Sequence, residues 1–248
     1  MRIWVTRPRD DAAAFADALK AQGHEAVVAP LFAPRSLVDT VTSDQLTAAA
    51  PTRIIVTSRN ALRALADAGL CTRLRNVPVL AVGPGTAAMA RTLGFQSVET
   101  GVGTATDLIS HVTYADPNQN GRYLFLRGQH VTVDVGAELA ACGYTATSVT
   151  LYDMQPDAAA PSFLLKALTD NALDAVALFS PNAAQRYVHL VAANGLEIAG
   201  QKLVHYVLSD RIAAELAPLQ PDRIAVAAQP NAEAMLALIG GRSAHSVH

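Results

Sequence analysis

Short apolar runs alternate with longer segments of helical periodicity along almost the whole chain. Such runs lie at residues 2–6, 54–56, 79–82, 123–126, 175–178 and 203–207. The segments between them are rich in Ala and Leu, and residues 12–22 are typical because Phe15, Ala18 and Leu19 fall on one helical face. Regular alternation of strands and helices predicts an α/β fold with largely parallel sheets.

Internal repeats indicate that this pattern occurs twice. Residues 2–32 align without a gap with residues 122–152. Identical pairs in this alignment include Arg2 and Arg122, Arg7 and Arg127, Leu19 and Leu139, Gly23 and Gly143, Ala26 and Ala146, and Leu31 and Leu151. Shorter repeated segments pair residues 58–61 with 180–183, 82–87 with 208–213, and 103–105 with 230–232. These repeats predict two copies of one α/β domain.

The order of the repeated segments along the chain predicts that one domain is discontinuous. The segment at 2–32 opens the chain, whereas its partner at 122–152 follows the other elements of its own copy. We therefore expect the domains to comprise residues 1–34 with 156–240 and residues 38–150, followed by a flexible tail at 241–248. The chain would cross between the domains near 33–36 and again near 152–156, which makes a two-stranded hinge.

Composition excludes several classes of protein. The chain has a formal net charge of −2 and only 16% charged residues, which argues against a protein that coats nucleic acid. No apolar stretch approaches the roughly 20 residues of a membrane span, and the acidic pair Asp10 and Asp11 does not suit a signal peptide. We expect a cytoplasmic protein, with Cys71 and Cys142 as reduced thiols.

Polar motifs follow most of the predicted strands. They lie at residues 6–9, 57–60, 83–86, 127–128, 180–182 and 209–211. In open α/β sheets ligands bind beyond the carboxyl ends of the strands, where helix N-termini present free amides. If the two domains face each other, these motifs line one cleft.

Each motif alone also has a purely structural explanation. The side chains of Ser58, Thr86, Ser180 and Asn231 suit helix N-caps. Six arginines could bind an anion but could equally be solvated surface charges, namely Arg7, Arg9, Arg59, Arg127, Arg186 and Arg211. The residue types alone leave both interpretations open.

The sequence lacks the signatures of other chemistries. The seven histidines do not pair with Glu or Cys at metal-ligand spacing, and Gly83 and Gly85 lack the third glycine of a dinucleotide site. A P-loop lysine motif and a nucleophile elbow are also missing. We therefore expect no metal and no cofactor, and a cleft whose amides, hydroxyls and guanidinium groups suit a polyanion.

Together the motifs resemble one known family. They are the segments 5–8, 56–58, 82–87, 127–128 with Gly143, 151–152 and 179–181. In this order they resemble the uroporphyrinogen-III synthase family of porphyrin biosynthesis, from residue 2 to about residue 239. The resemblance implies two doubly wound, Rossmann/flavodoxin-like domains, a two-stranded β linker and an active cleft between the domains.

The resemblance also implies a substrate and a reaction. The substrate is hydroxymethylbilane, a linear tetrapyrrole rich in carboxylates, and a monomer without cofactor suffices to convert it. Loss of the terminal hydroxyl leaves an azafulvene cation, and closure through a spiro intermediate inverts the last pyrrole. The protein must fold the chain of pyrroles so that its ends meet, and must exclude water.

Site residues follow from the same resemblance. Tyr152 matches the family's tyrosine at the end of the linker strand and would assist departure of the hydroxyl, although a hinge tyrosine packed by its ring is the alternative. Hydroxyls and neighbouring amides would hold carboxylates, and the residues concerned are Ser58, Gly83, Thr86, Gly128 and Ser180. Arg7 and Arg127 would add charge or pin their own loops.

The chain departs from the family pattern at one turn. Where a second Gly-x-x-Thr-Ala turn is usual, Ser209 replaces the glycine and Ile212 replaces the threonine, so Ser209 or Arg211 would have to substitute in binding. A different class of function shares the expected architecture, namely a two-domain binding or sensing module for an anionic ligand. Such a protein would need a signal peptide or a DNA-binding segment, and neither is visible.

Overall fold

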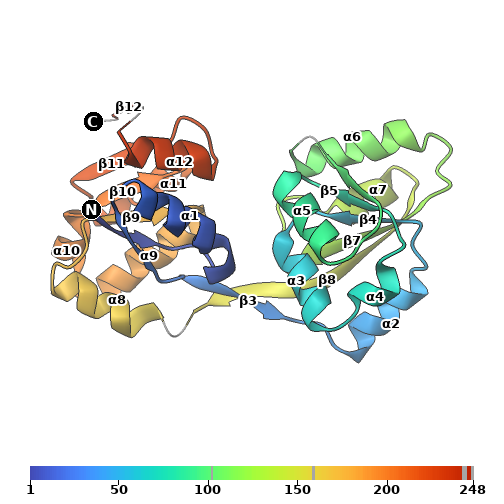
Figure 1. Cartoon of the computed structure of the whole chain (residues 1–248), viewed down its shortest axis with the longest axis horizontal. Helices are drawn as coiled ribbons and strands as arrows, with labels where there is room; N and C mark the ends of the chain where they lie inside the picture. Colours follow the sequence, from blue (N-terminus) through green and yellow to red (C-terminus); the bar gives the residue numbers. More distant parts are fainter. Residues whose placement is uncertain (102, 158–159, 242–244, 247–248) are drawn as a thin grey trace. The chain divides into compact units, whose positions relative to one another are not determined.

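The computed structural model describes residues 1–101, 103–157, 160–241 and 245–246. The chain divides into two compact units, Met1–Ala33 with Gln155–His248 and Pro34–Met154 (Figure 1). Each unit contains one sheet, and nearly all strand pairs are parallel. The predicted α/β class with parallel sheets is confirmed.

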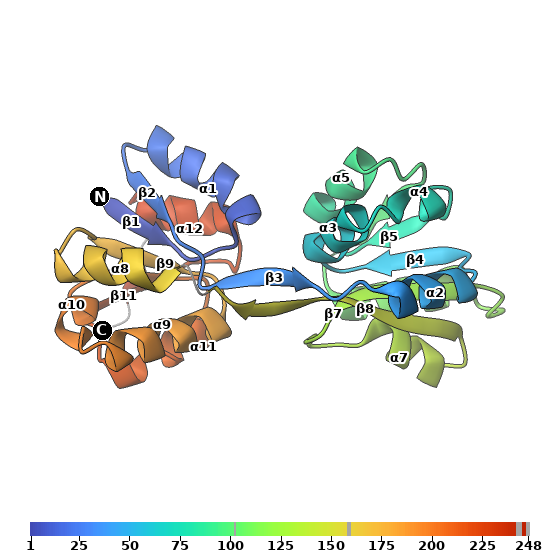
Figure 2. The ribbon, with the colours of Figure 1, turned by 90° about the horizontal axis from the view of Figure 1, so that it is seen from below.

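The sheet of the first unit has the order β12-β11-β10-β9-β1-β2. Its strands are β1 (Arg2–Val5), β2 (Glu25–Val28), β9 (Ala175–Leu178), β10 (Val204–Val207), β11 (Arg223–Val226) and β12 (His245–Ser246). Its helices are α1 (Arg9–Ala21), α8 (Ala160–Thr169), α9 (Pro181–Ala193), α10 (Glu197–Gln201), α11 (Asp210–Ala214), the 3-10 turn η1 (Ala217–Leu219) and α12 (Ala232–Ile239). Helices α1 and α12 cover one face, and α9 and α11 cover the other (Figure 2).

The sheet of the second unit has the order β3-β8-β7-β4-β5-β6. Its strands are β3 (Phe32–Ser36), β4 (Arg53–Val56), β5 (Val79–Ala81), β6 (Val98–Thr100), β7 (Arg122–Gly128) and β8 (Thr145–Pro156). Its helices are α2 (Thr40–Ala48), α3 (Arg59–Asp67), α4 (Cys71–Leu74), α5 (Pro84–Thr92), α6 (Ala105–Ala115) and α7 (Val135–Ala141). Buried residues of α3 and α5 pack on one face, and those of α6 and α7 on the other.

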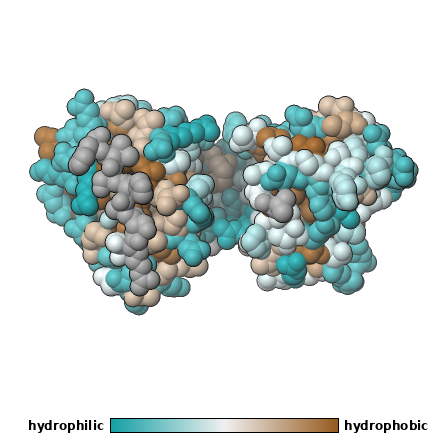
Figure 3. Space-filling model, turned by 90° about the horizontal axis from the view of Figure 1, so that it is seen from above, coloured by the Kyte–Doolittle hydropathy of each residue, from teal (hydrophilic) through white to brown (hydrophobic). Residues whose placement is uncertain are grey.

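Both sheets are buried on two faces, which explains why their central strands read as continuous apolar runs. In β1, Trp4 belongs to one core, whereas Ile3 and Val5 belong to the opposite core. In β4, Ile54 and Val56 face one core and Ile55 faces the other. Figure 3 shows a surface of mixed polarity over both units, with small scattered apolar patches.

The two units share one topology. The strands β11, β10, β9, β1 and β2 of the first sheet follow the same order as β6, β5, β4, β7 and β8 of the second. The repeated glycines have the same local role, because Gly23 and Gly143 both adopt positive φ, at 80° and 90°, directly after a helix. The next amide then reaches back to Leu19 or Leu139 at 3.0 Å. These features confirm the internal repeat.

Two strands carry the chain across the boundary of the units. The boundary falls between Ala33 and Pro34 within β3, and between Met154 and Gln155 within β8. Backbone bonds link Leu37 to Leu151 and Asp157 to Leu31. As the residue number rises from 31 to 37 on the β3 side, the number of the partner falls from 157 to 151, so β3 and β8 run antiparallel.

Some details of the sequence interpretation were wrong. The first helix begins at Arg9 rather than at residue 12. Arg127 and Gly128 lie within β7 rather than after it. The expected tail includes residues 242–244 and 247–248, which lie outside the described residues, whereas His245–Ser246 pair antiparallel with β11. In the described part of the chain we find no helix long and apolar enough to span a bilayer.

Candidate active site

Four neighbouring strands of the second unit bring predicted site residues to one edge of the sheet. Gly128 ends β7, and Ser58 and Gly83 follow the ends of β4 and β5. Tyr152 lies within β8, which continues to Pro156, so the expectation that Tyr152 ends its strand was wrong. Gly128 is paired with Tyr152 across β7 and β8. Parallel register across the other strands keeps their ends level. Residues far apart in sequence thus meet where ligands of open α/β sheets bind.

Tyr152 and Ser58 are in direct contact. The phenol of Tyr152 donates a hydrogen bond to Ser58 Oγ at 3.0 Å, and the tyrosine is 9% exposed. Ser58 is also the N-cap of α3, where its Oγ accepts the backbone N–H of Asn60 at 3.1 Å. The predicted cap at Ser58 is confirmed. One hydroxyl therefore holds both the start of a helix and the phenol.

Gly128 provides the space in which the ring of Tyr152 lies. A Cβ at position 128 would fall 2.7 Å from Cζ and 2.9 Å from the phenol oxygen of Tyr152. Gln129, the residue after β7, donates its amide to the carbonyl of Tyr152 at 2.8 Å. Any side chain larger than hydrogen at position 128 would displace the ring.

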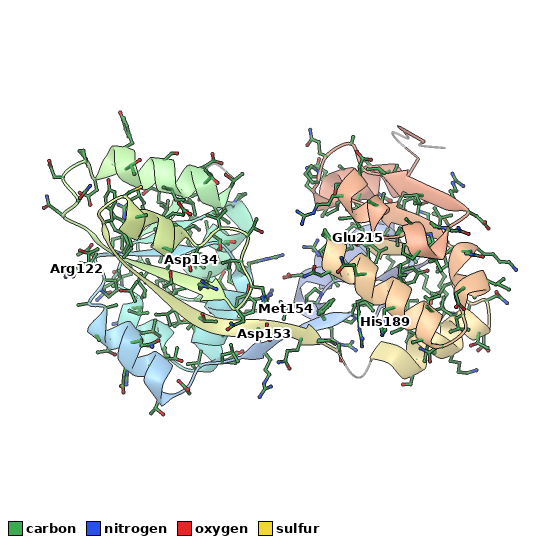
Figure 4. All side chains as sticks on the ribbon, turned by 180° about the vertical axis from the view of Figure 1, so that it is seen from behind. Arg122, Asp134, Asp153, Met154, His189 and Glu215 are labelled. Carbon is green, nitrogen blue, oxygen red and sulfur yellow. The ribbon has the colours of Figure 1, made fainter. Side chains whose placement is uncertain are left out.

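Asn60, Arg63 and Met154 extend this cluster, and of these three residues only Asn60 lies in a motif, 57–60, that the sequence placed at this edge. Asn60 Nδ2 lies 3.6 Å from the sulfur of Met154, which follows Tyr152 by two residues on β8. Arg63 donates to Asn60 Oδ1 at 2.7 Å. Met154 and Asp153 are adjacent on this strand (Figure 4), and alternation places their side chains on opposite faces. For Arg63 the only available signal was its i, i+3 spacing from Asn60 on α3.

The start of α5 presents backbone amides at the same edge. Gly83 is the N-cap and Pro84 the first helical residue, so Thr86 lies inside the helix and is 8% exposed. The predicted cap at Thr86 was therefore wrong, because the helix starts at Pro84 and its cap, Gly83, lies three residues before Thr86. Among the described residues no hydrogen bond is found for the amides of Gly85 and Thr86. Such amides favour an anion.

Arg127 is engaged within its own unit. Its Nε donates to the Gly128 carbonyl at 3.0 Å, its Nη2 donates to the Gln129 carbonyl at 2.8 Å, and its Nη1 forms an ion pair with Asp134. Asp134, labelled in Figure 4, also accepts from Ser148 Oγ at 2.6 Å. These bonds agree with the interpretation that Arg127 pins its loop.

The environment of Asp134 favours its charged form. Burial opposes ionisation, but the hydrogen bonds from Ser148 and from the Ala137 amide, together with the charge of Arg127, lower the pKa of Asp134 overall. Asp134 is in addition the N-cap of α7, where it receives the Ala137 amide at 3.1 Å. The ion pair of Arg127 and Asp134 therefore stabilises the backbone at Gly128, whose carbonyl accepts a hydrogen bond from Arg127.

The carboxyl edge of the first unit carries the corresponding residues. Arg7 follows β1, and its guanidinium carbon lies 4.8 Å from the centre of the Phe179 ring, within range of a cation–π contact. Ser180 follows β9 and caps α9 by accepting the Ala183 amide at 3.2 Å, as predicted. Strands β1 and β9 are neighbours, so Arg7 and Ser180 share this edge.

The divergent turn after β10 differs from its counterpart in the second unit. Ser209 is the N-cap of α11, but its side chain makes no capping bond, and Arg211 in the first turn is exposed. Asn231 caps α12 through a 2.8 Å bond from the Ala234 amide, as predicted. Among the described residues no group of three or more His, Cys, Asp or Glu side chains could hold a metal ion. Cys71 and Cys142 are both free thiols.

Comparison with known proteins agrees with the fold. A family model described as uroporphyrinogen-III synthase HemD matches residues 13–237. The chain belongs to the uroporphyrinogen-III synthase family. The predicted family is confirmed, and the match includes Ser58, Gly128 and Tyr152 but not Arg7. No curated protein matches the chain by sequence.

Solved structures of uroporphyrinogen-III synthases share the fold. The chain is similar to the enzyme of Helicobacter pylori 26695, with a TM-score of 0.60 and 16% identity over 98% of this chain and 100% of that chain. It is also similar to a mutant enzyme of Thermus thermophilus, with a TM-score of 0.54 and 20% identity over 95% and 96% of the two chains. At these identities the likeness concerns the fold alone.

Proposed function

We propose that the chain is a uroporphyrinogen-III synthase that cyclises hydroxymethylbilane, with inversion of the terminal pyrrole and loss of water. One observation carries the proposal. In a chain of this family, the Tyr152 phenol is hydrogen-bonded to Ser58 at 3.0 Å, at the same sheet edge as the backbone amides that begin α5. A proton donor and an anion-binding helix start are the two groups that the reaction requires.

Tyr152 acts as the general acid in this proposal. Its phenol gives a proton to the terminal hydroxyl, which leaves as water, so that an azafulvene cation and a phenolate result. The pyrrole at the far end attacks through its substituted carbon to give a spiro intermediate, which fragments and closes again at the neighbouring carbon. The cyclised cation then loses a proton to the phenolate, and Tyr152 is restored.

Amides and hydroxyls at both sheet edges hold the carboxylates of the substrate. In the second unit we assign this role to the α5 amides beside Gly83 and Thr86, and to the loop at Gly128. In the first unit we assign it to Ser180 and Arg7. Ser209 and Arg211 take the place of the turn from which the chain departs.

We further propose that the compact units act as two domains, residues 1–34 with 156–240 and residues 38–150. The crossings near 33–36 and 152–156 then form the two-stranded β linker. Because one chain supplies every group named above, a cytoplasmic monomer suffices. The mechanism draws its electrons from the pyrroles and needs neither metal nor cofactor, and its partner is a small molecule rather than nucleic acid or membrane.

Isomer analysis tests the proposal. The purified protein, treated with a chelator and stripped of small molecules, is incubated with hydroxymethylbilane, and the porphyrin isomers are separated after oxidation. We expect isomer III, with an apparent substrate affinity that weakens as salt screens charge over about 8 Å at physiological ionic strength. A binding or sensing module would retain the ligand yet leave only the spontaneous isomer I, and that result would overturn the assignment.

A further inference from the structure

We infer that Ser58 is a positioning residue for Tyr152, which orients the phenol before the reaction and donates a hydrogen bond to it once the proton has left. The inference deepens the proposed function and rests on it. It starts from the contact between the Tyr152 phenol and Ser58 Oγ at 3.0 Å, which joins residues 94 positions apart.

The hydrogen bonds around Ser58 fix its orientation. The backbone N–H of Asn60 can only donate, so Ser58 Oγ accepts it at 3.1 Å. The Tyr152 phenol donates to the same oxygen. A serine hydroxyl accepts two hydrogen bonds and donates one. Its acceptor capacity is therefore filled, and its own hydrogen is directed away from these two partners.

Ionisation of Tyr152 reverses one of these bonds. When the phenol transfers its proton to the departing hydroxyl, the Tyr152 oxygen becomes an acceptor and Ser58 can rotate its O–H toward it. A hydrogen bond to a charged oxygen is about twice as strong as a neutral one, so this bond gains strength as the charge develops. The positive end of α3, which begins at Arg59 directly after Ser58, acts in the same direction.

Capping alone would explain a serine at this position, and the other caps allow the two roles to be separated. Asn231 caps α12 with one bond from the Ala234 amide, as Ser58 caps α3 with one bond from the Asn60 amide. Ser58 differs from Asn231 because its Oγ also accepts a hydrogen bond from the phenol of Tyr152. Loss of the cap should act on stability, whereas loss of positioning should act on turnover through Tyr152.

A double-mutant cycle separates these roles. Ser58→Gly removes the hydroxyl but keeps a residue that is tolerated at an N-cap, and we expect kcat for isomer III to fall about tenfold, as for the loss of one hydrogen bond to an ionised group. In the Tyr152→Phe background the same substitution should leave kcat unchanged, because Phe has no hydroxyl to position. Ser58→Thr should restore kcat. Any direct contact of Ser58 with substrate would change KM in both backgrounds.

Asn231→Gly is the matched control for loss of a cap. This variant should keep the kcat of the parent protein, and its urea unfolding midpoint should change as little as the midpoint of Ser58→Gly does. Equal losses of kcat from Ser58→Gly in the parent and in Tyr152→Phe would overturn the inference and leave the proposed function intact. Unchanged kcat in Ser58→Gly would also overturn it. If the parent protein gave only isomer I, that result would instead disprove the proposed function, and this inference with it.

Discussion

The α-carbon of Gly128 lies against the ring of Tyr152, so closely that a methyl group at position 128 would approach Cζ to 2.7 Å. The two residues are paired across β7 and β8, where the register shifts after Arg127. The irregular pairing brings the ring over the backbone, and the phenol then reaches Ser58. Glycine at this position therefore sets the place of the proposed catalytic group.

We predict that Gly128→Ala lowers kcat to about the level of Tyr152→Phe. The clashing atoms belong to the far end of a side chain, so the ring can move aside and the cost in unfolding free energy should be only about 1 kcal/mol, that of the lost hydrogen bond to Ser58. Isomer III formation and urea unfolding measure the two effects. In the Tyr152→Phe background, Gly128→Ala should change kcat little further, and a large additional loss would show that Gly128 acts on the substrate directly.

Tyr152→Phe should reduce turnover on the order of 10- to 1000-fold without abolishing it, because one proton donor is lost while the substrate can still ionise slowly unaided. The fold should be nearly unaffected, since Ser58 keeps its bond from the Asn60 amide. Tyr144→Phe is the control: it removes a 2.9 Å bond from a buried tyrosine to the Asp116 carbonyl, away from the proposed site. Full activity of Tyr152→Phe would make Tyr152 a packing residue.

Arg127→Gln should destabilise the second unit, because it leaves the Asp134 carboxylate without its ion pair and removes donors to two loop carbonyls. We expect a loss of about 1–3 kcal/mol at pH 7 by urea unfolding. The pKa of Asp134 is lowered in the folded state, so its contribution is present above its ordinary pKa of about 3.9 and is lost as the pH falls below it. The difference between parent and variant should shrink there. Unchanged stability with a raised KM would instead assign Arg127 to the substrate.

The sequence predicted the central strands well, because a strand buried on both faces is a continuous apolar run. Strands β4 and β9 were identified for this reason. Edge strands lack this signal, and β6 and β11 contain polar or half-exposed residues and were not identified. The internal repeat predicted two similar α/β units, which local patterns could not, whereas the order of the strands within each sheet came from the structure.

The site was predicted residue by residue but not as a set of contacts. Ser58 was identified as a cap from its place after a strand, yet a bond between residues 58 and 152 leaves no periodic trace in a single sequence. The wrong cap at Thr86 is a different kind of error, because the sequence did contain a local signal for the earlier start of the helix. That signal was Pro84, since proline is favoured at the first helical position. The contact of Asn60 with Met154 likewise depends on how β8 passes α3.

The first unit contains a buried polar cluster away from the proposed site. His205 on β10 is completely buried, and its Nε2 lies 3.0 Å from the hydroxyl of Tyr187, which donates to the Gly200 carbonyl at 3.3 Å. Which of the two groups donates in the bond between His205 Nε2 and the Tyr187 hydroxyl depends on the tautomer of the neutral imidazole. Trp4 packs edge-on against Tyr187 with ring centres 5.5 Å apart. A second proton on His205 would place a charge in this core.

We predict that this histidine makes the protein less stable in mild acid. Burial lowers the pKa of His205 from 6.5 to about 4, so between these values the unfolded chain binds a proton that the folded chain does not. Unfolding therefore becomes easier as the pH falls through this window, by on the order of 3 kcal/mol in total. His205→Gln keeps a hydrogen-bonding group near Tyr187 but cannot titrate, and the free energy of unfolding of this variant should fall less between pH 7 and pH 5. Urea unfolding of both proteins at the two pH values gives the comparison, in which His24 and the other titrating groups cancel because both proteins carry them. Equal losses in parent and variant would mean that His205 is protonated in the folded state.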